Sequence, residues 1–444
     1  MRIPSVPGFD QGAFEKYFKN AGWLMSGKIL SMVVGFMIAQ FLGPSAFGDL
    51  SFATAFTAII AAIATLGLDS FIIREILNDP EKQNEILGTA FWLRIVVGAL
   101  IIPVSVLSYL FFHNLADQPG DSLTLIISLC ASASFFKAFN IIDSYFQSQV
   151  KSKHVVHVQN SCLVLSSAIK IWFVWLELPL IYFALALVID GFLLSIGLVV
   201  MYRYQNLHIR QWTFSADRAK SLLKQSWPLI LTTVMITLYM QIDTIMLKDI
   251  RGSAQVGIYS AAARISEAWY FIPVAIISSV FPAIIYARKN DSERYMKRLQ
   301  NLYDLLIGIS LPVALLISFS SNIIIDFLYG TEFEGAGPIL SIHIWSGIFV
   351  FLGSASSQYL LAEGFTLISF YRTAIGAAIN IVLNLFLIPW YGGIGASIAT
   401  LIAYFAATFS ILLFPGGRQQ GLMMIKSLFL ISMIGNFFRL RSDN

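Results

Sequence analysis

The sequence predicts an all-α integral membrane protein, in which twelve transmembrane helices form two parallel six-helix bundles around a central cavity. Of its 444 residues, 57% are hydrophobic and only 12% are charged, whereas soluble domains carry about 25% charged residues. The apolar residues occur in runs of about 20, the length that a helix needs to cross a bilayer. Basic residues gather in alternate loops, and the second half of the chain repeats a motif of the first.

The apolar runs are too long for the ~10-residue alternating strands of an outer-membrane barrel. The twelve predicted spans cover residues 20–42, 47–72, 86–112, 123–147, 154–176, 178–202, 225–248, 254–286, 300–328, 336–361, 367–389 and 393–414. Only Glu177–Pro179 separates the fifth span from the sixth, which predicts a tight hairpin. A final apolar run, 422–438, is short and precedes Arg439 and Arg441, so we expect a helix at the membrane surface.

Lysine and arginine follow the even-numbered spans. The longest of these loops, 204–224, carries Arg210, Arg218, Lys220 and Lys224. The loops after odd-numbered spans are short, and only one of them contains basic residues, Lys248 and Arg251. Because basic loops stay in the cytoplasm, the pattern predicts that both termini are cytoplasmic.

A weak repeat relates the two halves. The residues GDLSFA at 48–53 and GIYSAA at 257–262 lie 209 positions apart, and Trp23 corresponds loosely to Trp227. A parallel duplication of six spans explains this spacing, and chance similarity of small residues is the alternative. The predicted domains are an N-terminal bundle (1–203), a cytoplasmic linker (204–224), a C-terminal bundle (225–414) and a cytoplasmic tail with the interfacial helix (415–444).

Several charged residues fall inside predicted spans. Arg264 lies about ten residues into the eighth span, which is ~15 Å deep in a slab of ~30 Å. A charge at this depth costs ~2.5–3.5 kcal/mol on insertion scales. The other cations that we expect to bind an anionic substrate are Lys28, Lys137 and Lys170. For each lysine, extension of the side chain to the membrane surface is the alternative.

Three carboxylates accompany these cations. Asp190, Asp243 and Glu267 are candidates either to bind a coupling ion or to act as counter-ions. The structural alternatives are an ion pair for Asp190, a helix-end position for Asp243 and a local pair between Glu267 and Arg264.

Polar residues recur at helical spacing inside the spans. We expect Asn140, Gln241, Asn380 and Asn384 to line a hydrophilic cavity. Taken singly, each of them has hydrogen bonding between helices as the alternative.

Motifs for other chemistry are absent from the sequence. It contains no GxxxxGK[ST] phosphate loop and no zinc spacing around its two cysteines. His154 and His157 lack an accompanying carboxylate cluster. We therefore expect no catalytic residue, metal, cofactor or nucleic-acid partner, and a protein that is not an enzyme.

Two groups of motifs resemble the polysaccharide transporters. They are FLGPSAFG (41–48) with LGL (66–68), and YMQIDTIM (239–246) with VGIYSAAAR (256–264). The resemblance is to Wzx-type flippases of lipid-linked O-antigen and related oligosaccharides, in the multidrug/oligosaccharidyl-lipid/polysaccharide exporter superfamily. It implies a V-shaped pair of bundles that works by alternating access, with Lys28 and Arg264 facing the cavity.

The same resemblance implies a substrate and a location. The substrate is an undecaprenyl-pyrophosphate-linked oligosaccharide, moved from the cytoplasmic to the periplasmic leaflet of the bacterial inner membrane. H⁺ or Na⁺ is the expected coupling ion, and a polysaccharide polymerase and a chain-length regulator are candidate partners besides the lipid bilayer. A multidrug or cation antiporter, a membrane glycan polymerase and a scaffold remain alternatives. The antiporter would favour acidic cavity residues, and the polymerase would need a large external loop.

Overall fold

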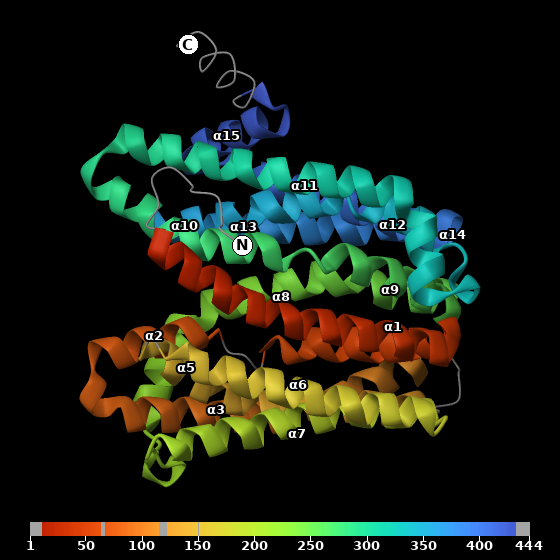
Figure 1. Cartoon of the computed structure of the whole chain (residues 1–444), viewed down its shortest axis with the longest axis horizontal. Helices are drawn as coiled ribbons and strands as arrows, with labels where there is room; N and C mark the ends of the chain where they lie inside the picture. Colours follow the sequence, from red (N-terminus) through yellow and green to blue (C-terminus); the bar gives the residue numbers. More distant parts are fainter. Residues whose placement is uncertain (1–10, 64–66, 115–121, 150, 432–444) are drawn as a thin grey trace. The chain divides into compact units, whose positions relative to one another are not determined.

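A computed structural model of the chain describes residues 11–63, 67–114, 122–149 and 151–431, and all regular structure in these ranges is helical. The chain divides into two compact units (Figure 1). One unit comprises Gly22–Gly257, and the other comprises Ile258–Asn444 together with Met1–Ala21. The predicted domain boundaries at 203, 224 and 414 refer to the duplicated halves, and they stay a prediction.

The first unit contains the helices up to α8, with α1 entering it at Gly22. Its main elements are α1 (Gln11–Ala61), α2 (Asp69–Asn78), α3 (Gln83–Asn114), α4 (Ser122–Phe135), α5 (Ile141–Ser148), α6 (Ser152–Trp175), α7 (Leu180–Tyr204) and α8 (Ala216–Arg251). Short 3₁₀ helices lie between them at η2 (Pro80–Lys82), η3 (Phe136–Asn140) and η4 (Ile209–Gln211).

The second unit begins inside the next helix. Its elements are α9 (Ser253–Glu267), α10 (Phe271–Asn290), α11 (Ser292–Tyr329), η5 (Thr331–Phe333), α12 (Ala336–His343), α13 (Ser346–Ala362), α14 (Thr366–Phe409), η6 (Ser410–Leu413), η7 (Pro415–Gly417) and α15 (Arg418–Leu428). Of the predicted interfacial helix 422–438, residues 432–438 lie outside the described part of the chain, and the helix begins earlier, at Arg418.

Eight helical segments of the described chain are long and apolar enough to cross a membrane. They are Ile29–Ala61, Pro80–Phe112, Ser122–Ser148, Leu180–Tyr204, Leu229–Arg251, Ser292–Tyr329, Ala336–Ala362 and Thr366–Leu413. The protein is therefore a multi-pass membrane protein, as the composition predicts, and the count of twelve spans stays a prediction.

Two of these helical segments are broken at positions where the sequence predicts a loop between two spans. Gly43 in α1 has φ 68° and ψ 170°, and Gly392 in α14 has φ 55° and ψ −131°, so each interrupts a helix. Glycine adopts positive φ without the penalty that a Cβ imposes. Both breaks fall in short loops of the predicted topology, GPSA (43–46) and YGG (391–393). Two further predicted spans coincide with α6 and with the α9–α10 pair.

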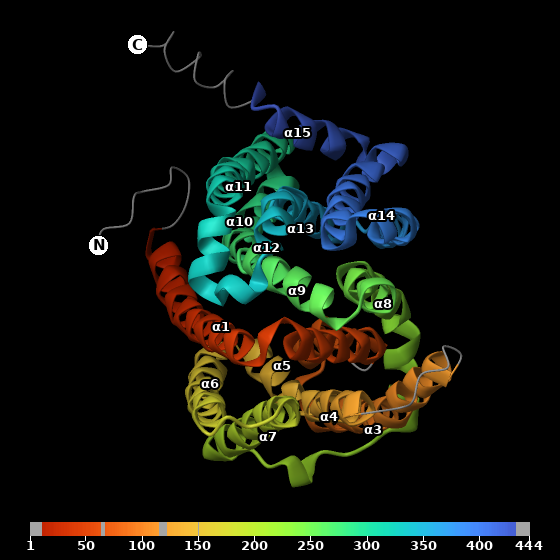
Figure 2. The same ribbon diagram turned by 90° about the vertical axis from the view of Figure 1, so that its right-hand side faces the viewer.

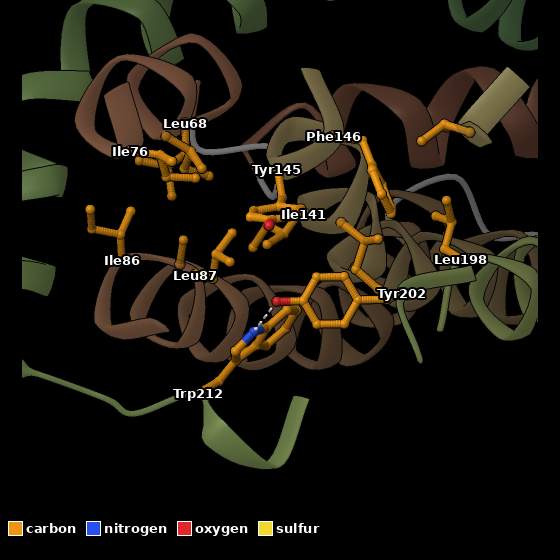
Figure 3. Packing of buried hydrophobic residues seen from close by; sticks show 14 of the residues in the cluster. Leu68, Ile76, Ile86, Leu87, Ile141, Tyr145, Phe146, Leu198, Tyr202 and Trp212 are labelled. Atoms are coloured by element: carbon orange, nitrogen blue, oxygen red, sulfur yellow. Dashed lines mark hydrogen bonds between the residues drawn. The ribbon is translucent and has the colours of Figure 1, made fainter. Parts of the chain in front are cut away.

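An aromatic cluster packs the connection between α7 and α8 against other helices of the first unit. Tyr202 and Trp212 are buried against Ile86 of α3 and Tyr145 of α5, and the indole Nε1 of Trp212 donates to Tyr202 Oη at 3.1 Å (Figure 3). The backbone N–H of Ser215 donates to Thr89 at 3.0 Å. The first part of the predicted linker 204–224 is therefore packed on the bundle that precedes it.

The two repeat motifs meet in a reciprocal contact within the first unit. A Cβ on Gly48 would collide with the backbone carbonyl of Ser253, and a Cβ on Gly257 would collide with that of Pro44. Pro44 and Ser253, like Gly48 and Gly257, are 209 positions apart. Residues of a two-fold pair make such mutual contacts, and small residues allow close approach of membrane helices. The geometry supports the predicted duplication.

We expect Gly48→Val and Gly257→Val to destabilise the protein by ~1–3 kcal/mol each, because each side chain must push two backbones apart. The measurement is thermal unfolding of the purified protein in detergent. Gly347→Ala is the matched control, since a Cβ there lies 3.6 Å from Tyr270, an ordinary contact. Equal melting temperatures for all variants would contradict the close packing.

Candidate functional site

Lys137 lies where the fourth predicted span leaves α-helical geometry. The 3₁₀ segment η3 (Phe136–Asn140) separates α4 from α5 and contains both Lys137 and Asn140. Tight 3₁₀ turns inside a helix change the direction of side chains and often accompany functional sites. Ser195 of α7 donates to the carbonyl of Phe136 at 3.2 Å. Lys137 is surrounded by many protein atoms, and its side chain is nevertheless exposed.

Lys170 and Asp190 form an ion pair between α6 and α7. Lys170 Nζ lies 2.5 Å from Asp190 Oδ2, and the hydroxyl of Ser166 donates to the other carboxylate oxygen. Both charged side chains are partly exposed. The structure therefore brings together a predicted substrate-binding cation and a predicted coupling carboxylate. In this arrangement each balances the charge of the other.

A second ion pair of the first unit joins two residues that the sequence reasoning missed. Arg94 of α3 lies 2.8 Å from the carboxylate of Asp69, the first residue of α2, which also accepts from Ser144 at 3.2 Å. The side chain of Arg94 is 5% exposed and that of Asp69 is 58% exposed. Arg94 stands inside the predicted span 86–112, and its charge in that apolar run is the signal that could have found it.

Three other predicted residues of the first unit lie on α1 and α8. Lys28 is in α1, and its side chain lies outside the described part of the structure. The neighbouring Gly27 packs closely against Asn160 of α6. On α8, Asp243 is buried and Gln241 is half-buried.

Arg264 lies in the second unit, near the end of α9. Its neighbours include Glu267 and Tyr329, which lie close enough to interact with it electrostatically. Like Lys137, it lies deep among protein atoms and is nevertheless exposed. A cation in this situation can meet a solute that enters the space beside it.

The helix that carries Arg264 ends at Glu267, in the middle of the predicted span 254–286. Residues 268–270 form a turn, and α10 begins at Phe271. Pro273 explains the break locally, because it has no N–H to donate to the preceding turn. Ser266 donates to the carbonyl of His343 at 3.2 Å, and Tyr270 and Ser346 hydroxyls are 3.2 Å apart. These bonds fix the end of α9 against α12 and α13.

Asn380 and Asn384 are fully buried in α14, and Asn384 Nδ2 donates to Asn380 Oδ1 at 3.1 Å. In this structure they lie in the interior of the second unit. Arg372, eight residues before Asn380 on the same helix, donates to Ser356, Ser357 and the carbonyl of Gly353 on α13. Arg372 thus joins α14 to α13 by hydrogen bonds. That Asn380 and Asn384 line a cavity stays a prediction.

A family model described as polysaccharide biosynthesis protein matches residues 37–338, more than half of the chain. An uncharacterised membrane protein of Methanocaldococcus jannaschii is 27% identical over 83% of this chain and 89% of its own length. A probable flippase of Haloferax volcanii, AglR, is 31% identical over 37% of this chain and 35% of its own. A putative O-antigen transporter of Shigella flexneri is 21% identical over 86% of this chain and 93% of its own.

Solved structures of transporters share the fold. An inward-facing multidrug resistance transporter of the MATE family superimposes with a TM-score of 0.71 at 17% identity, covering 90% of this chain and 96% of that one. The lipid II flippase MurJ superimposes with a TM-score of 0.67 at 16% identity, covering 95% of this chain and 93% of that one. The relatives and fold neighbours with a stated role are transporters or flippases, and none of these is described as an enzyme.

Proposed function

The chain belongs to the polysaccharide biosynthesis protein family, as a Wzx-type transporter of the multidrug/oligosaccharidyl-lipid/polysaccharide exporter superfamily, and from this premise we propose that it is a flippase for a lipid-linked glycan. Its substrate in this proposal is an oligosaccharide carried on undecaprenyl pyrophosphate. The protein moves the glycan from the cytoplasmic to the periplasmic leaflet by alternating access.

One observation carries the assignment of the substrate chemistry. Arg264 and Lys137 are deep in their units and still exposed. A cation is costly to hold in a membrane protein unless an anion or water reaches it. Arg264 interacts with Glu267 and Tyr329, and a pyrophosphate group is a more highly charged anion that an arginine can bind through two parallel hydrogen bonds. Lys28 is a third cation that we propose to bind the substrate. Lys170 takes a secondary part, because Asp190 already balances its charge.

Ion coupling is assigned to carboxylates close to these cations. Glu267 follows Arg264 by three residues and interacts with it, so a proton or Na⁺ at Glu267 would change the charge that the substrate meets. Asp190 stands in the same relation to Lys170. Asp243 is buried on α8. Coupling to H⁺ or Na⁺ through one of these groups is part of the proposal.

The proposed topology has twelve spans in two bundles, with both termini in the cytoplasm of a bacterial cell. The breaks at Gly43 and Gly392 support it, because each divides a long helix at a predicted loop. The mutual contact of Gly48 with Ser253 and of Gly257 with Pro44 supports the duplication. The proposed domains keep their predicted limits, 1–203 and 225–414.

A multidrug antiporter remains the second candidate, because a multidrug transporter shares the fold. An antiporter of cationic drugs needs acidic side chains to bind them. The two exposed side chains on which the substrate assignment rests, Arg264 and Lys137, are basic. The sign of these charges favours an anionic substrate.

Deletion of the gene in its host tests the proposal. We expect lipid-linked oligosaccharide to accumulate in the cytoplasmic leaflet, where a membrane-impermeant glycan-labelling reagent reaches it in inside-out vesicles but not in intact spheroplasts. Restoration of the gene should return the label to spheroplasts. Unchanged leaflet distribution together with increased drug sensitivity would support the antiporter instead.

A further inference from the structure

The last described helix, α15, crosses the second unit at a steep angle. In Figure 1 the long axis of α11 runs across the view, whereas in Figure 2 α11 is seen nearly end-on and α15 is seen lengthwise. The two helices pack against each other. The helix α15 therefore runs across α11, whose apolar part is a candidate membrane span.

Polar side chains of α15 face the protein. Ser427 donates to Asp304 of α11 at 2.5 Å and accepts from Gln300 at 2.7 Å. Gln420 donates to Tyr303 and accepts from Ser356 of α13 at 3.3 Å. Gln420 and Ser427 are both buried. These hydrogen bonds hold α15 in one orientation on the unit.

The opposite ridge of α15, extended by its C-cap residue Phe429, combines apolar and basic residues. Leu422 and Phe429 are 54% and 66% exposed, and Arg418 and Lys426 are exposed as well. The four residues follow each other at three- or four-residue spacing, so they lie along one side of the helix. Large apolar side chains that alternate with cations are typical of helices lying in the plane of a membrane surface.

The position of α15 along α11 marks the level of a membrane surface. The first turns of α11 carry Glu293, Arg294, Lys297 and Arg298. After Asp304 no charged residue occurs until Asp326. The partners of α15 are Gln300, Tyr303 and Asp304, at the boundary between the charged and the apolar part. A helix held at this level and across the span lies where lipid headgroups meet acyl chains.

We propose that the exposed ridge of α15 is a binding surface for anionic phospholipid headgroups. Arg418 and Lys426 pair with lipid phosphates, and Leu422 and Phe429 insert between the upper acyl chains. Charge complementarity favours this occupant over a protein partner, because membrane leaflets carry negative surface charge that attracts basic segments. The inference does not depend on the glycan-flipping proposal, since the ridge belongs to a different helix from Arg264 and Lys137.

Hydrogen exchange of the full-length protein in lipid nanodiscs tests this surface. We expect the amides of 418–428 to exchange more slowly in phosphatidylglycerol nanodiscs than in phosphatidylcholine nanodiscs. Two cations near a membrane surface each contribute about fivefold in affinity, or about 30-fold together. The double variant Arg418→Gln/Lys426→Gln should therefore lose the difference between the two lipids.

Matched variants separate this effect from changes in folding or net charge. Lys220→Gln/Lys224→Gln removes two exposed lysines of α8 and should keep the lipid-dependent difference. Arg418→Lys/Lys426→Arg retains the charges and should also keep it. The proposal is overturned if the unaltered protein exchanges equally in both lipids, or if the Arg418→Gln/Lys426→Gln variant keeps the difference.

Discussion

Replacement of Arg264 by alanine is expected to abolish glycan translocation while the protein still inserts into the membrane. Arg264 is exposed at the end of α9, so its removal leaves no cavity in a packed core. It does remove the charge that would bind the pyrophosphate. Loss of a charge-assisted interaction costs ~3 kcal/mol, which corresponds to a rate about 100-fold lower. The measurement is surface glycan in a strain that carries only the variant, together with the amount of protein in the membrane.

Two companion variants sharpen this test. Arg264→Lys keeps the charge but loses the planar fork of donors, so we expect intermediate activity. Arg251→Ala removes an exposed arginine at the end of α8 and should leave translocation unchanged. Normal surface glycan with Arg264→Ala would remove Arg264 from the proposed site. Accumulation of lipid-linked oligosaccharide in the cytoplasmic leaflet after gene deletion would still support the flippase function. Failure of the Arg264 assignment is therefore distinguishable from failure of the proposed function.

The second large effect is expected at Asp69. Its carboxylate is 58% exposed, whereas its partner Arg94 is 5% exposed. Asp69→Ala deprives a buried arginine of its ion-pair partner, and such a loss costs ~3–5 kcal/mol. We expect a clear fall in the melting temperature of the detergent-purified protein.

The reverse substitution serves as the control. Arg94→Gln leaves the exposed Asp69 carboxylate free to interact with water, so it should destabilise less than Asp69→Ala. The double variant Asp69→Ala/Arg94→Gln should recover part of the stability, because no buried charge is then left behind. If the Asp69→Ala variant unfolds at the same temperature as the unaltered protein, the ion pair does not contribute to the stability of the fold.

Arg264 and Arg94 show which properties of a charged residue the sequence pattern predicts and which it does not. Both are arginines within apolar runs, and hydropathy treats them alike. In the structure one is exposed beside Glu267 and Tyr329, and the other is buried against Asp69. Arg94 pairs with a carboxylate of a neighbouring helix, whereas Glu267 stands on the same helix as Arg264. For Arg94 this partner is 25 positions earlier in the chain, at the first residue of α2.

The sequence by itself determined the membrane class, the helical fold, the family and the presence of charges inside apolar runs. These properties follow from local composition and spacing, because a lipid environment forces each spanning segment to satisfy its own backbone hydrogen bonds. Only the tertiary structure decided which charges neutralise each other, as Lys170 and Asp190 do. It also decided that α15 turns its polar residues inward and its apolar ridge outward. Which charges pair, and which side of a helix faces the protein, depend on contacts between helices that are distant in the chain. The hydropathy of a single segment does not predict these contacts.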